Sequence, residues 1–311
     1  MIEFTNTHFH YRAQEPVLHG LSLRVQPGEV YGLIGANGSG KSTALACLLG
    51  LLHPTQGAAR IGGCQMKDAA PWERARMAAL LQDAPVDTAL TLEEHEAWLS
   101  PWHPRWNGAR LREMAARFQL PHGRRLGQLS GGQKRLAAAA LTLASEAEVL
   151  ILDEPAANLD PWSRRKLLEE ISSLLADRPD TAMLYCTHLL ADLERLGTKA
   201  GWIDAGRLAF ELALEDLGAR WRHITLIFDG AVPSGFALPG SLPTVIRGPV
   251  ATGIATFASE VERDAYIAMA PGRIEASPVT LEEVFLHWRQ HTEAGPPDAA
   301  TSAFTPVPSF H

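Results

Sequence analysis

The sequence predicts an α/β fold whose core is a mostly parallel, doubly wound sheet. Short apolar runs typical of buried strands alternate with helical patterns, as where Val149–Leu152 precedes a helix expected over Pro161–Ala176. A glycine-rich segment, Gly35–Gly40, joins another apolar run directly to a helix. Strands that alternate with helices form parallel sheets covered by those helices, because each helical crossover returns the chain in the same direction.

The first part of the chain is expected to hold short strands joined by turns. Leu21–Val25 alternates apolar and polar residues, and Val30–Ile34 is a continuous apolar run. A helix is expected over Ser42–Leu52, where a following proline stops it. Residues 71–82 are expected to form a short helix and then a short strand that ends at Gln82.

A helical insertion is expected over about Asp83–Leu126, where the strand signal disappears. Thr91 and Glu94 have the spacing of a capping box, in which each side chain bonds the backbone N–H of the other residue and opens a helix. A break rich in tryptophan and proline follows, and a second helix is expected over Gly108–Phe118.

Strands and helices alternate again after the insertion. The expected elements are a helix from Ser130, helices over Pro161–Ala176 and Leu189–Leu196, and strands over Val149–Leu152, Ala182–Cys186 and Ala200–Ile203. After about Leu217, a small α+β appendix is expected, with strands near Ile224–Phe228, Thr244–Ile246 and Ile254–Phe257 and helices near Glu260–Ala270 and Leu281–Arg289. The last residues, Thr292–His311, are rich in Pro, Ala, Ser and Thr and are expected to be disordered.

Composition limits the classes of protein to which the chain can belong. Of 311 residues, 28 are basic and 35 acidic, and the formal net charge of −7 argues against a general nucleic-acid binder. No run approaches the ~20 apolar residues of a spanning helix, and the N-terminal residues lack the pattern of a signal peptide. Three scattered cysteines form neither a disulfide framework nor a metal-ligand cluster. We therefore expect a soluble, cytosolic protein that holds any anionic ligand by a local device.

The clearest motif is a phosphate-binding loop. Gly35–Ser42 fits G-x-x-x-x-G-K-[ST], and it lies between a strand and a helix, as the motif requires. Its glycines let backbone N–H groups turn inward on a polyphosphate, and the helix N-terminus adds partial positive charge. Lys41 is expected to reach the β- and γ-phosphates, and Ser42 to ligate Mg²⁺. An ordinary glycine-rich turn is the alternative, against which the flanking elements argue.

Two carboxylates, Asp153 and Glu154, directly follow a buried-strand run. In a parallel sheet this end of a strand faces the ligand crevice. Asp153 suits the Mg²⁺ side of a phosphoryl-transfer site, and Glu154 is placed to orient or polarise the attacking water. The alternative is a strand-end turn with solvated acids.

Leu129–Gln133 adds a second candidate anion site. Ser130 is a good N-cap, and two glycines expose backbone N–H groups at the positive end of the helix that follows. A well-capped helix without a ligand is the alternative interpretation.

With these residues in place, the chain resembles the nucleotide-binding subunit of an ATP-binding cassette (ABC) transporter. Gly35–Ser42 corresponds to the family's Walker A motif, Leu129–Gln133 to its signature sequence, and Asp153 and Glu154 to the Walker B acids. The resemblance covers roughly residues 2–218. It implies a P-loop NTPase fold of the ABC ATPase type, with a mostly parallel core sheet, an antiparallel β subdomain and a helical insertion, followed by the small C-terminal α+β appendix.

The resemblance also implies roles for residues outside these motifs. Tyr11 stands where the family carries an aromatic that stacks on adenine, with Phe9 as the other candidate and a plain surface aromatic as the alternative. Gln82 matches the Q-loop glutamine, which acts with Mg²⁺ and in coupling. Residues 158–160 match the D-loop, and His188 matches the switch histidine that contacts the γ-phosphate.

Three sets of site residues follow from the motifs and the resemblance together. The residues expected to act in catalysis are Glu154, His188 and Gln82. The residues expected to hold Mg²⁺ are Ser42, Gln82 and Asp153. The residues expected to contact ATP are Tyr11, Gly35, Asn37, Gly38, Ser39, Gly40, Lys41, Ser42, Thr43, Ser130, Gly131, Gly132, Gln133 and Asp160.

The resemblance implies partners as well as ligands. In the family, the signature of one subunit caps the ATP held by the phosphate loop of another, so a second copy or a paralogue is expected in an ATP-sandwich dimer. ATP-driven closure and hydrolysis then move separate membrane-spanning permease subunits. The chain is therefore expected to be peripheral on the cytoplasmic face of the cell membrane, with no nucleic-acid partner.

Two segments favour an exporter of the bacterial ABC-2 type, because His103–Asn107 and Thr280–Leu286 are similar to segments of that group. An importer ATPase is one alternative. A soluble ABC ATPase that acts on DNA or ribosomes is another, although the chain has one cassette, no sustained heptads and a net acidic balance. Trp98, Trp102 and Trp106 lie near the region where the family docks its membrane subunit, and local packing is the alternative role for them.

The predicted domains are an ABC ATPase domain over 1–218, with its helical subdomain at about 83–140, an accessory domain over 219–290 and a disordered tail over 291–311. No role is predicted for the accessory domain, and no transported substrate is predicted.

Overall fold

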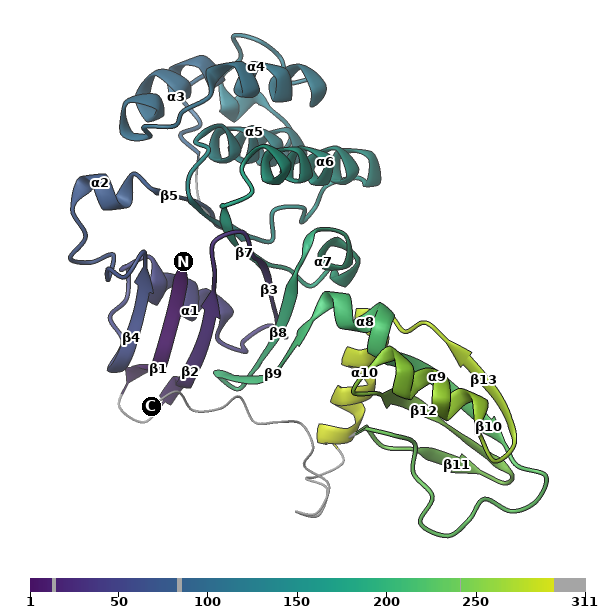
Figure 1. Ribbon diagram of the computed structural model, residues 1–311. Helices are drawn as coiled ribbons and strands as arrows, with labels where there is room; N and C mark the ends of the chain where they lie inside the picture. The colour runs from purple at the N-terminus through teal and green to yellow at the C-terminus, as the bar shows by residue number, and fades with distance from the viewer. Residues whose placement is uncertain (13–14, 83–85, 241, 294–311) are drawn as a thin grey trace. The chain divides into compact units, whose positions relative to one another are not determined.

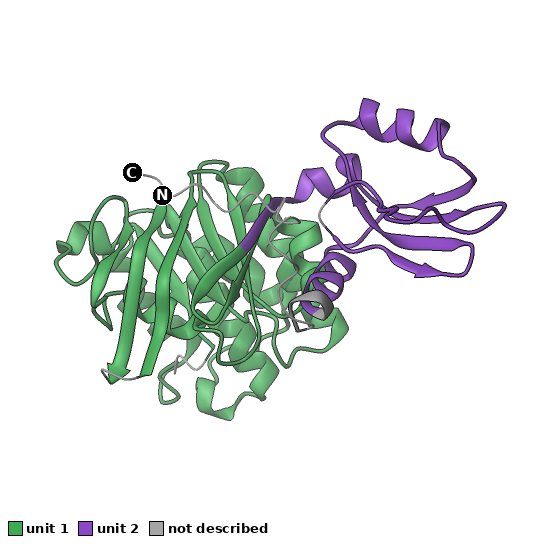
Figure 2. Cartoon of the chain, turned by 90° about the horizontal axis from the view of Figure 1, so that it is seen from below, with its two compact units in different colours: residues 1–209 green, residues 210–311 purple. Residues whose placement is uncertain are grey.

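A computed structural model describes residues 1–12, 15–82, 86–240 and 242–293. By its internal contacts the chain divides into two compact units, Met1–Ala209 and Phe210–His311 (Figure 2). The boundary expected after residue 218 falls inside helix α8 (Leu214–Arg220) of the second unit. From residue 294 on, the expected tail lies outside the described residues, whereas residues 291–293 belong to the last helix.

The first unit is built around a six-stranded sheet with the strand order β5-β6-β7-β3-β8-β9 (Figure 1). Its strands are β3 (Val30–Ile34), β5 (Met77–Leu80), β6 (Val149–Asp153), β7 (Ala182–Cys186), β8 (Lys199–Asp204) and β9 (Arg207–Ala213). The pairs β5–β6, β6–β7, β7–β3 and β3–β8 are all parallel, which confirms the predicted parallel core. Every residue of β3, β6 and β7 is buried, and this double-sided burial explains why these strands are continuous apolar runs.

A second, antiparallel sheet of three strands confirms the β subdomain that the resemblance implied. Its order is β2-β1-β4, with β1 (Ile2–Arg12), β2 (Glu15–Val25) and β4 (Gln56–Ile61). Helix α1 (Lys41–Leu48) ends earlier than the predicted Leu52. Its buried side chains share one hydrophobic cluster with both sheets, so the helix that follows the phosphate loop is fixed between them.

The helical insertion contains α3 (Leu92–Leu99), the 3₁₀ turns η1 (Ser100–Trp102) and η2 (Leu126–Gln128), and α4 (Gly108–Arg117). It leads into α5 (Gly131–Ala144), against which α4 packs (Figure 1). The capping boxes at Thr91 and Ser130 are both present. The remaining helices of this unit are α2 (Pro71–Arg74), α6 (Pro161–Asp177) and α7 (Leu190–Leu196).

The second unit is a four-stranded antiparallel sheet with helices, as the predicted α+β appendix requires. Its strand order is β11-β12-β10-β13. Besides α8, its elements are β10 (Trp221–Ile227), β11 (Val245–Arg247), β12 (Val250–Thr256), α9 (Glu260–Ala268), β13 (Arg273–Ser277) and α10 (Leu281–Glu293). Its own core includes Ile224, Leu226 and Phe257. Within the described ranges, no helix of either unit combines the length and apolarity needed to cross a bilayer.

Candidate functional site

The phosphate loop has the backbone that its glycines were expected to provide. Gly38 and Gly40 have φ angles of +80° and +106°, a left-handed conformation that glycine adopts without a Cβ penalty. At Gly35 a Cβ would lie 2.5 Å from Ser39 Oγ and 2.6 Å from the carbonyl oxygen of Ile203, so no larger residue fits. The loop therefore runs tightly from β3 into the N-terminus of α1, where Gly40 is the N-cap.

Lys41 lies across the loop that it follows. Its Nζ donates hydrogen bonds to the carbonyl oxygens of Gly35, at 2.6 Å, and Ala36, at 3.1 Å. The ammonium charge is thereby placed at the mouth of the loop, where a polyphosphate would need it.

Gly206, in the turn between β8 and β9, holds the loop from outside. Its N–H donates to the carbonyl oxygen of Ser39 at 2.9 Å, and its own carbonyl accepts from His19 N–H at 3.0 Å. A Cβ on Gly206 would lie 2.0 Å from the carbonyl oxygen of Val17, so β2, the turn and the loop are in close contact.

A pocket of about 200 Å³ brings half of the predicted site residues together. It lies at the carboxyl ends of the parallel strands, as open α/β sheets place their ligand sites. Its lining residues are Val17, Asn37, Gly38, Gly40, Lys41, Ser42, Thr43, Gln82, Asp153 and Glu154. Phosphate-loop donors and two acids therefore face one another across a space of the size that a phosphate chain requires.

The two acids are buried, with Asp153 6% and Glu154 7% exposed. Burial, and next the neighbouring charge of Glu154, raises the pKa of Asp153 above its ordinary value. The backbone N–H of Gln82 and the charges of Lys41 and Arg135 act in the opposite direction. Asp153 thus carries a carboxylate in surroundings that favour an added cation.

Glu154 is positioned by an unusual backbone and by a histidine. Its φ is +49°, in the left-handed region, and its N–H donates to the carbonyl oxygen of Cys186 at 2.8 Å. Nδ1 of His188 lies 2.9 Å from Oε2 of Glu154, within ion-pair distance. The contact does not have hydrogen-bond geometry, and Oε2 is buried without a hydrogen-bond partner among the described residues. The structure therefore brings His188 beside Glu154, and Oε2, although close to the ring, forms no hydrogen bond among the described residues.

The donor set fits Mg²⁺. Ser42, Gln82 and Asp153 offer oxygen ligands from three separate segments around the same pocket, and Mg²⁺ prefers such ligands together with substrate phosphates. Two neighbouring buried carboxylates, Asp153 and Glu154, also place negative charge there that a divalent cation would neutralise, and the charge of Glu154 is, after burial, the second cause of the raised pKa of Asp153.

Tyr11, and not Phe9, presents an aromatic ring beside the loop. Tyr11 is 63% exposed, and its hydroxyl lies 3.5 Å from Thr43 Oγ1. Phe9 is buried and supports the Tyr11 ring edge-on, with ring centroids 4.9 Å apart. Only Tyr11 of this pair has an open ring face for stacking.

The signature residues do not line the pocket of their own chain. Ser130 and Gln133 complete a capping box at the start of α5, with Ser130 Oγ accepting from Gln133 N–H at 3.2 Å. Gly131 and Gly132 lie in the first turn of the same helix. Asp160 likewise accepts two backbone N–H bonds as the N-cap of α6.

The sequence predicted no role for two residues near the site, and it placed Gln82 at the end of a strand, where the structure does not. Val17 lines the pocket from β2, and Arg135 contacts the segments that carry Gln82 and Glu154. A single valine in a strand carries no functional signal, but a charged residue on the otherwise apolar face of α5 could have drawn attention to Arg135. Gln82 was expected to end a strand, whereas β5 ends at Leu80 and Gln82 lies in the turn beyond it.

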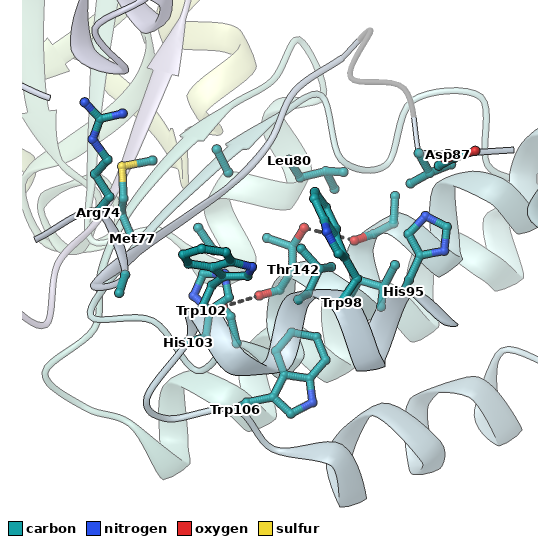
Figure 3. Close-up of a pocket in the computed structure, with 18 of the residues that line it drawn as sticks. Arg74, Met77, Leu80, Asp87, His95, Trp98, Trp102, His103, Trp106 and Thr142 are labelled. Atoms are coloured by element: carbon teal, nitrogen blue, oxygen red, sulfur yellow. Dashed lines mark hydrogen bonds between the residues drawn. The ribbon is translucent and has the colours of Figure 1, made fainter. Parts of the chain in front are cut away.

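A larger hollow of about 1260 Å³ lies between β5 and the helical insertion (Figure 3). Its lining is mostly apolar, and Trp98 and Trp102 contribute rings that are 65% and 63% exposed. Trp106 differs from them, because its Nε1 donates to Glu96 Oε1 at 3.2 Å and its ring lies near that of His103. Two of the three predicted tryptophans are thus open to a partner, and the third is held by its own subdomain.

Comparison with known proteins agrees with this geometry. The family model described as "ABC transporter" matches residues 18–157. The chain is 32% identical over 300 residues to the Nod factor export ATP-binding protein I of Paraburkholderia xenovorans (strain LB400), covering 92% of this chain and 95% of that protein. It is 33% identical over 291 residues to the daunorubicin resistance ATP-binding protein DrrA3 of Streptomyces coeruleorubidus, covering 87% and 90%.

A solved structure resembles the first unit. The dimeric structure of MJ0796, a bacterial ABC transporter cassette, superposes with a TM-score of 0.60 at 25% sequence identity, covering 69% of this chain and 99% of that one. The match over nearly the whole length of two curated relatives is the decisive comparison. The chain therefore belongs to the ATP-binding subunits of the ABC transporter family.

Proposed function

We propose that this subunit hydrolyses ATP with Mg²⁺ and uses the energy to power export through separate membrane-spanning subunits. The observation that carries the proposal is the meeting of Lys41, Ser42, Asp153 and Glu154 at one pocket, with His188 in contact with Glu154. A phosphate cradle alone would bind nucleotide, whereas a buried carboxylate that lines the same pocket can supply the water-orienting group that hydrolysis needs.

The chemistry divides among these residues. The loop N–H groups and Lys41 bind the phosphates, and Tyr11 offers a ring to the base. Glu154 orients a water for attack on the γ-phosphorus, and His188 fixes the carboxylate and contacts the same phosphate. Ser42, Asp153 and Gln82 would hold Mg²⁺, which neutralises charge on the phosphate oxygens when bound.

The position of the signature supports a dimer. Ser130, Gly131, Gly132 and Gln133 are ordered at a helix N-terminus but lie outside the pocket of their own chain. A helix N-terminus with exposed glycines is suited to an anion, and a second copy or a paralogue would bring it to the ATP. MJ0796 is described as a dimer, which is consistent with this arrangement. Closure of two copies on ATP and release after hydrolysis would form the working cycle.

The hollow with Trp98 and Trp102 supports a membrane partner. Exposed tryptophans in an apolar depression are typical centres of binding energy in protein interfaces. An apolar segment of a permease subunit fits this surface and would hold the chain at the cytoplasmic face of the membrane. Export is favoured because one relative is described as a Nod factor export protein and another as a daunorubicin resistance protein.

The test is phosphate release from ATP by the purified full chain, alone and together with its co-expressed membrane subunit. We expect release that requires Mg²⁺ and that the membrane subunit stimulates. Failure to release phosphate in both preparations, with ATP binding intact, would overturn the hydrolytic proposal. If the membrane subunit neither binds the chain nor changes its phosphate release, the transport part of the proposal is overturned.

A further inference from the structure

Arg135 lies one helical turn after the signature residue Gly131 and reaches away from the signature toward the core sheet. Its guanidinium donates to carbonyl oxygens of two separate segments. Nη1 donates to Leu81 at 2.8 Å and Gln82 at 3.2 Å, in the turn after β5. The second segment, at the end of β6, consists of Asp153, Glu154 and Pro155, which accept bonds of 2.5 Å, 2.7 Å and 3.3 Å from Nη2 and Nε.

Among the described residues, these contacts give each N–H donor of the guanidinium an acceptor. Arginine has five N–H donors in a rigid planar fork, one on Nε and two on each Nη. The five bonds divide as one from Nε and two from each Nη, so every donor has a carbonyl acceptor. A lysine at this position would have three donors on a single point and could not span both segments.

The two segments carry the residues on which hydrolysis depends in the proposed function. One contains Gln82, and the other contains Asp153 and Glu154, whose left-handed φ must be maintained by its surroundings. Leu80 of β5 pairs with Leu152 of β6, and the backbone N–H of Gln82 bonds the Asp153 side chain, but among the described residues no strand pairing or backbone–backbone hydrogen bond links the turn at Gln82 to Glu154 itself. The guanidinium fills that role, and it does so from the same helix that begins with the signature.

We propose that Arg135 is a positioning residue that fixes the backbones carrying Gln82 and Glu154 against each other and against the signature helix. The inference rests on the proposed ATPase function. Arg135 is not among the residues that line the pocket, and through its backbone contacts it fixes the positions from which the Gln82 and Glu154 side chains extend. The hydrogen bonds of Arg135 to the two segments form a clamp between them. Since a displacement of about 1 Å can lower turnover by roughly 100-fold, this clamp should affect turnover more than ATP binding.

The experiment compares Arg135→Lys with Arg165→Lys in the full chain. Arg165 is a matched control, because it lies on α6, is 74% exposed and bonds Glu169 at 2.9 Å. Amide hydrogen exchange is measured for peptides that contain Leu81–Gln82 and Asp153–Glu154, together with kcat and KM for ATP. For Arg135→Lys we expect exchange at both segments to accelerate about tenfold while distant strands are unchanged. We also expect kcat to fall roughly 10–100-fold and KM to change less than about threefold. Arg165→Lys should leave all of these values unchanged.

Unchanged exchange at the two segments would overturn the clamp, and accelerated exchange with normal kcat would overturn its role in turnover. Exchange that accelerates throughout the chain would mean a general loss of stability and would also overturn the inference. If the unmodified chain releases no phosphate, the proposed function fails, and the exchange measurement alone then decides whether the clamp exists.

Discussion

Nδ1 of His188 lies 2.9 Å from Oε2 of Glu154, and the two residues come from the ends of adjacent parallel strands. The histidine is largely exposed while the carboxylate is buried. A buried carboxylate oxygen thus lies next to a ring that is largely exposed to solvent. This contact joins the carboxylate proposed to orient water to a side chain that is largely open to solvent.

Replacing Glu154 by Gln should separate ATP binding from hydrolysis. The amide keeps the shape of the side chain but cannot polarise water, so we expect the ATP dissociation constant to stay within a few-fold and kcat to fall by about 100-fold or more. Equilibrium binding of a fluorescent ATP analogue and phosphate release measure the two effects. Glu169→Gln, on α6, is the control. Near-normal turnover in Glu154→Gln would remove Glu154 from its proposed role.

Lys41→Ala should weaken nucleotide binding itself. The ammonium already lies on the carbonyls of Gly35 and Ala36 at the mouth of the loop. Losing a charge-assisted contact to phosphate costs about 1.5–3 kcal/mol, which corresponds to roughly 10- to 150-fold in the dissociation constant. Titration calorimetry with ATP gives the value, and Lys67→Ala on the surface is the comparison. An unchanged affinity would contradict the assignment of the loop.

Mixing two inactive variants tests whether each ATP site is shared between two chains. Ser130→Arg should obstruct the site that the signature faces, and Lys41→Ala should disable the loop of its own chain. If each site combines the loop of one chain with the signature of another, a mixed dimer keeps one intact site. Phosphate release should then recover to at most about a quarter of normal activity, since half of random dimers are mixed and one of their two sites works. A mixture as inactive as its components would show that each site lies within one chain.

Asp153 should make the free energy of unfolding depend on pH. Its pKa is raised in the folded chain, so the folded state holds a proton more tightly than the unfolded state. The free energy of unfolding should therefore decrease as pH rises from the ordinary Asp pKa through the raised value. Asp153→Asn should remove this dependence and raise Tm near pH 7 without Mg²⁺, by about 2–4 °C for each kcal/mol regained. Thermal melts between pH 3 and 8, with exposed Asp180→Asn as control, would show it; a lower Tm at pH 7 would refute it.

Replacing either of the two exposed tryptophans should weaken binding to the membrane subunit without changing ATP hydrolysis by the chain alone. Trp98→Ala and Trp102→Ala should each weaken co-purification with the membrane subunit, by about 2 kcal/mol or more if they are central to the interface. Basal phosphate release by the isolated chain should not change. Trp72→Ala is the matched control, because Trp72 is 64% exposed but does not line the hollow. Loss of binding in the Trp72 variant alone would place the interface elsewhere.

Local signals in the sequence were enough for the central part of the site. The loop, the buried run before Asp153, the capping box at Thr91 and the N-cap at Ser130 depend on residues a few positions apart, and the described structure contains each of them. The antiparallel sheet was available only through the family resemblance, and the strand order was not predicted. The pattern of apolar residues fixes which face of a strand is buried, but not which strand lies next to it.

Other features depend on contacts between distant segments, and these could not be predicted. The clamp of Arg135 joins residues more than fifty positions apart, and Val17 lines the pocket only because β2 passes the loop. Strands β9 and β13 were missed for different reasons. The residues of β13 are exposed or partly exposed and give no clear apolar alternation. Strand β9 does alternate, with buried Phe210 and Leu212 between exposed or partly exposed residues, so its sequence held a signal that the prediction did not use.

The contact of Gly206 with the phosphate loop has a consequence for how the chain acquires its ligand. Ser39 is synthesised early, yet its carbonyl is held by an N–H that leaves the ribosome much later, and Val17 packs on the same turn. Contacts of such long sequence separation form slowly, because the intervening chain must first be ordered. A nascent chain that stops before the turn at Ala205 and Gly206 would carry the full loop motif without the support that shapes it. We therefore expect ATP to recognise the cassette only once translation has passed this turn, so nucleotide binding distinguishes completed cassettes from unfinished ones.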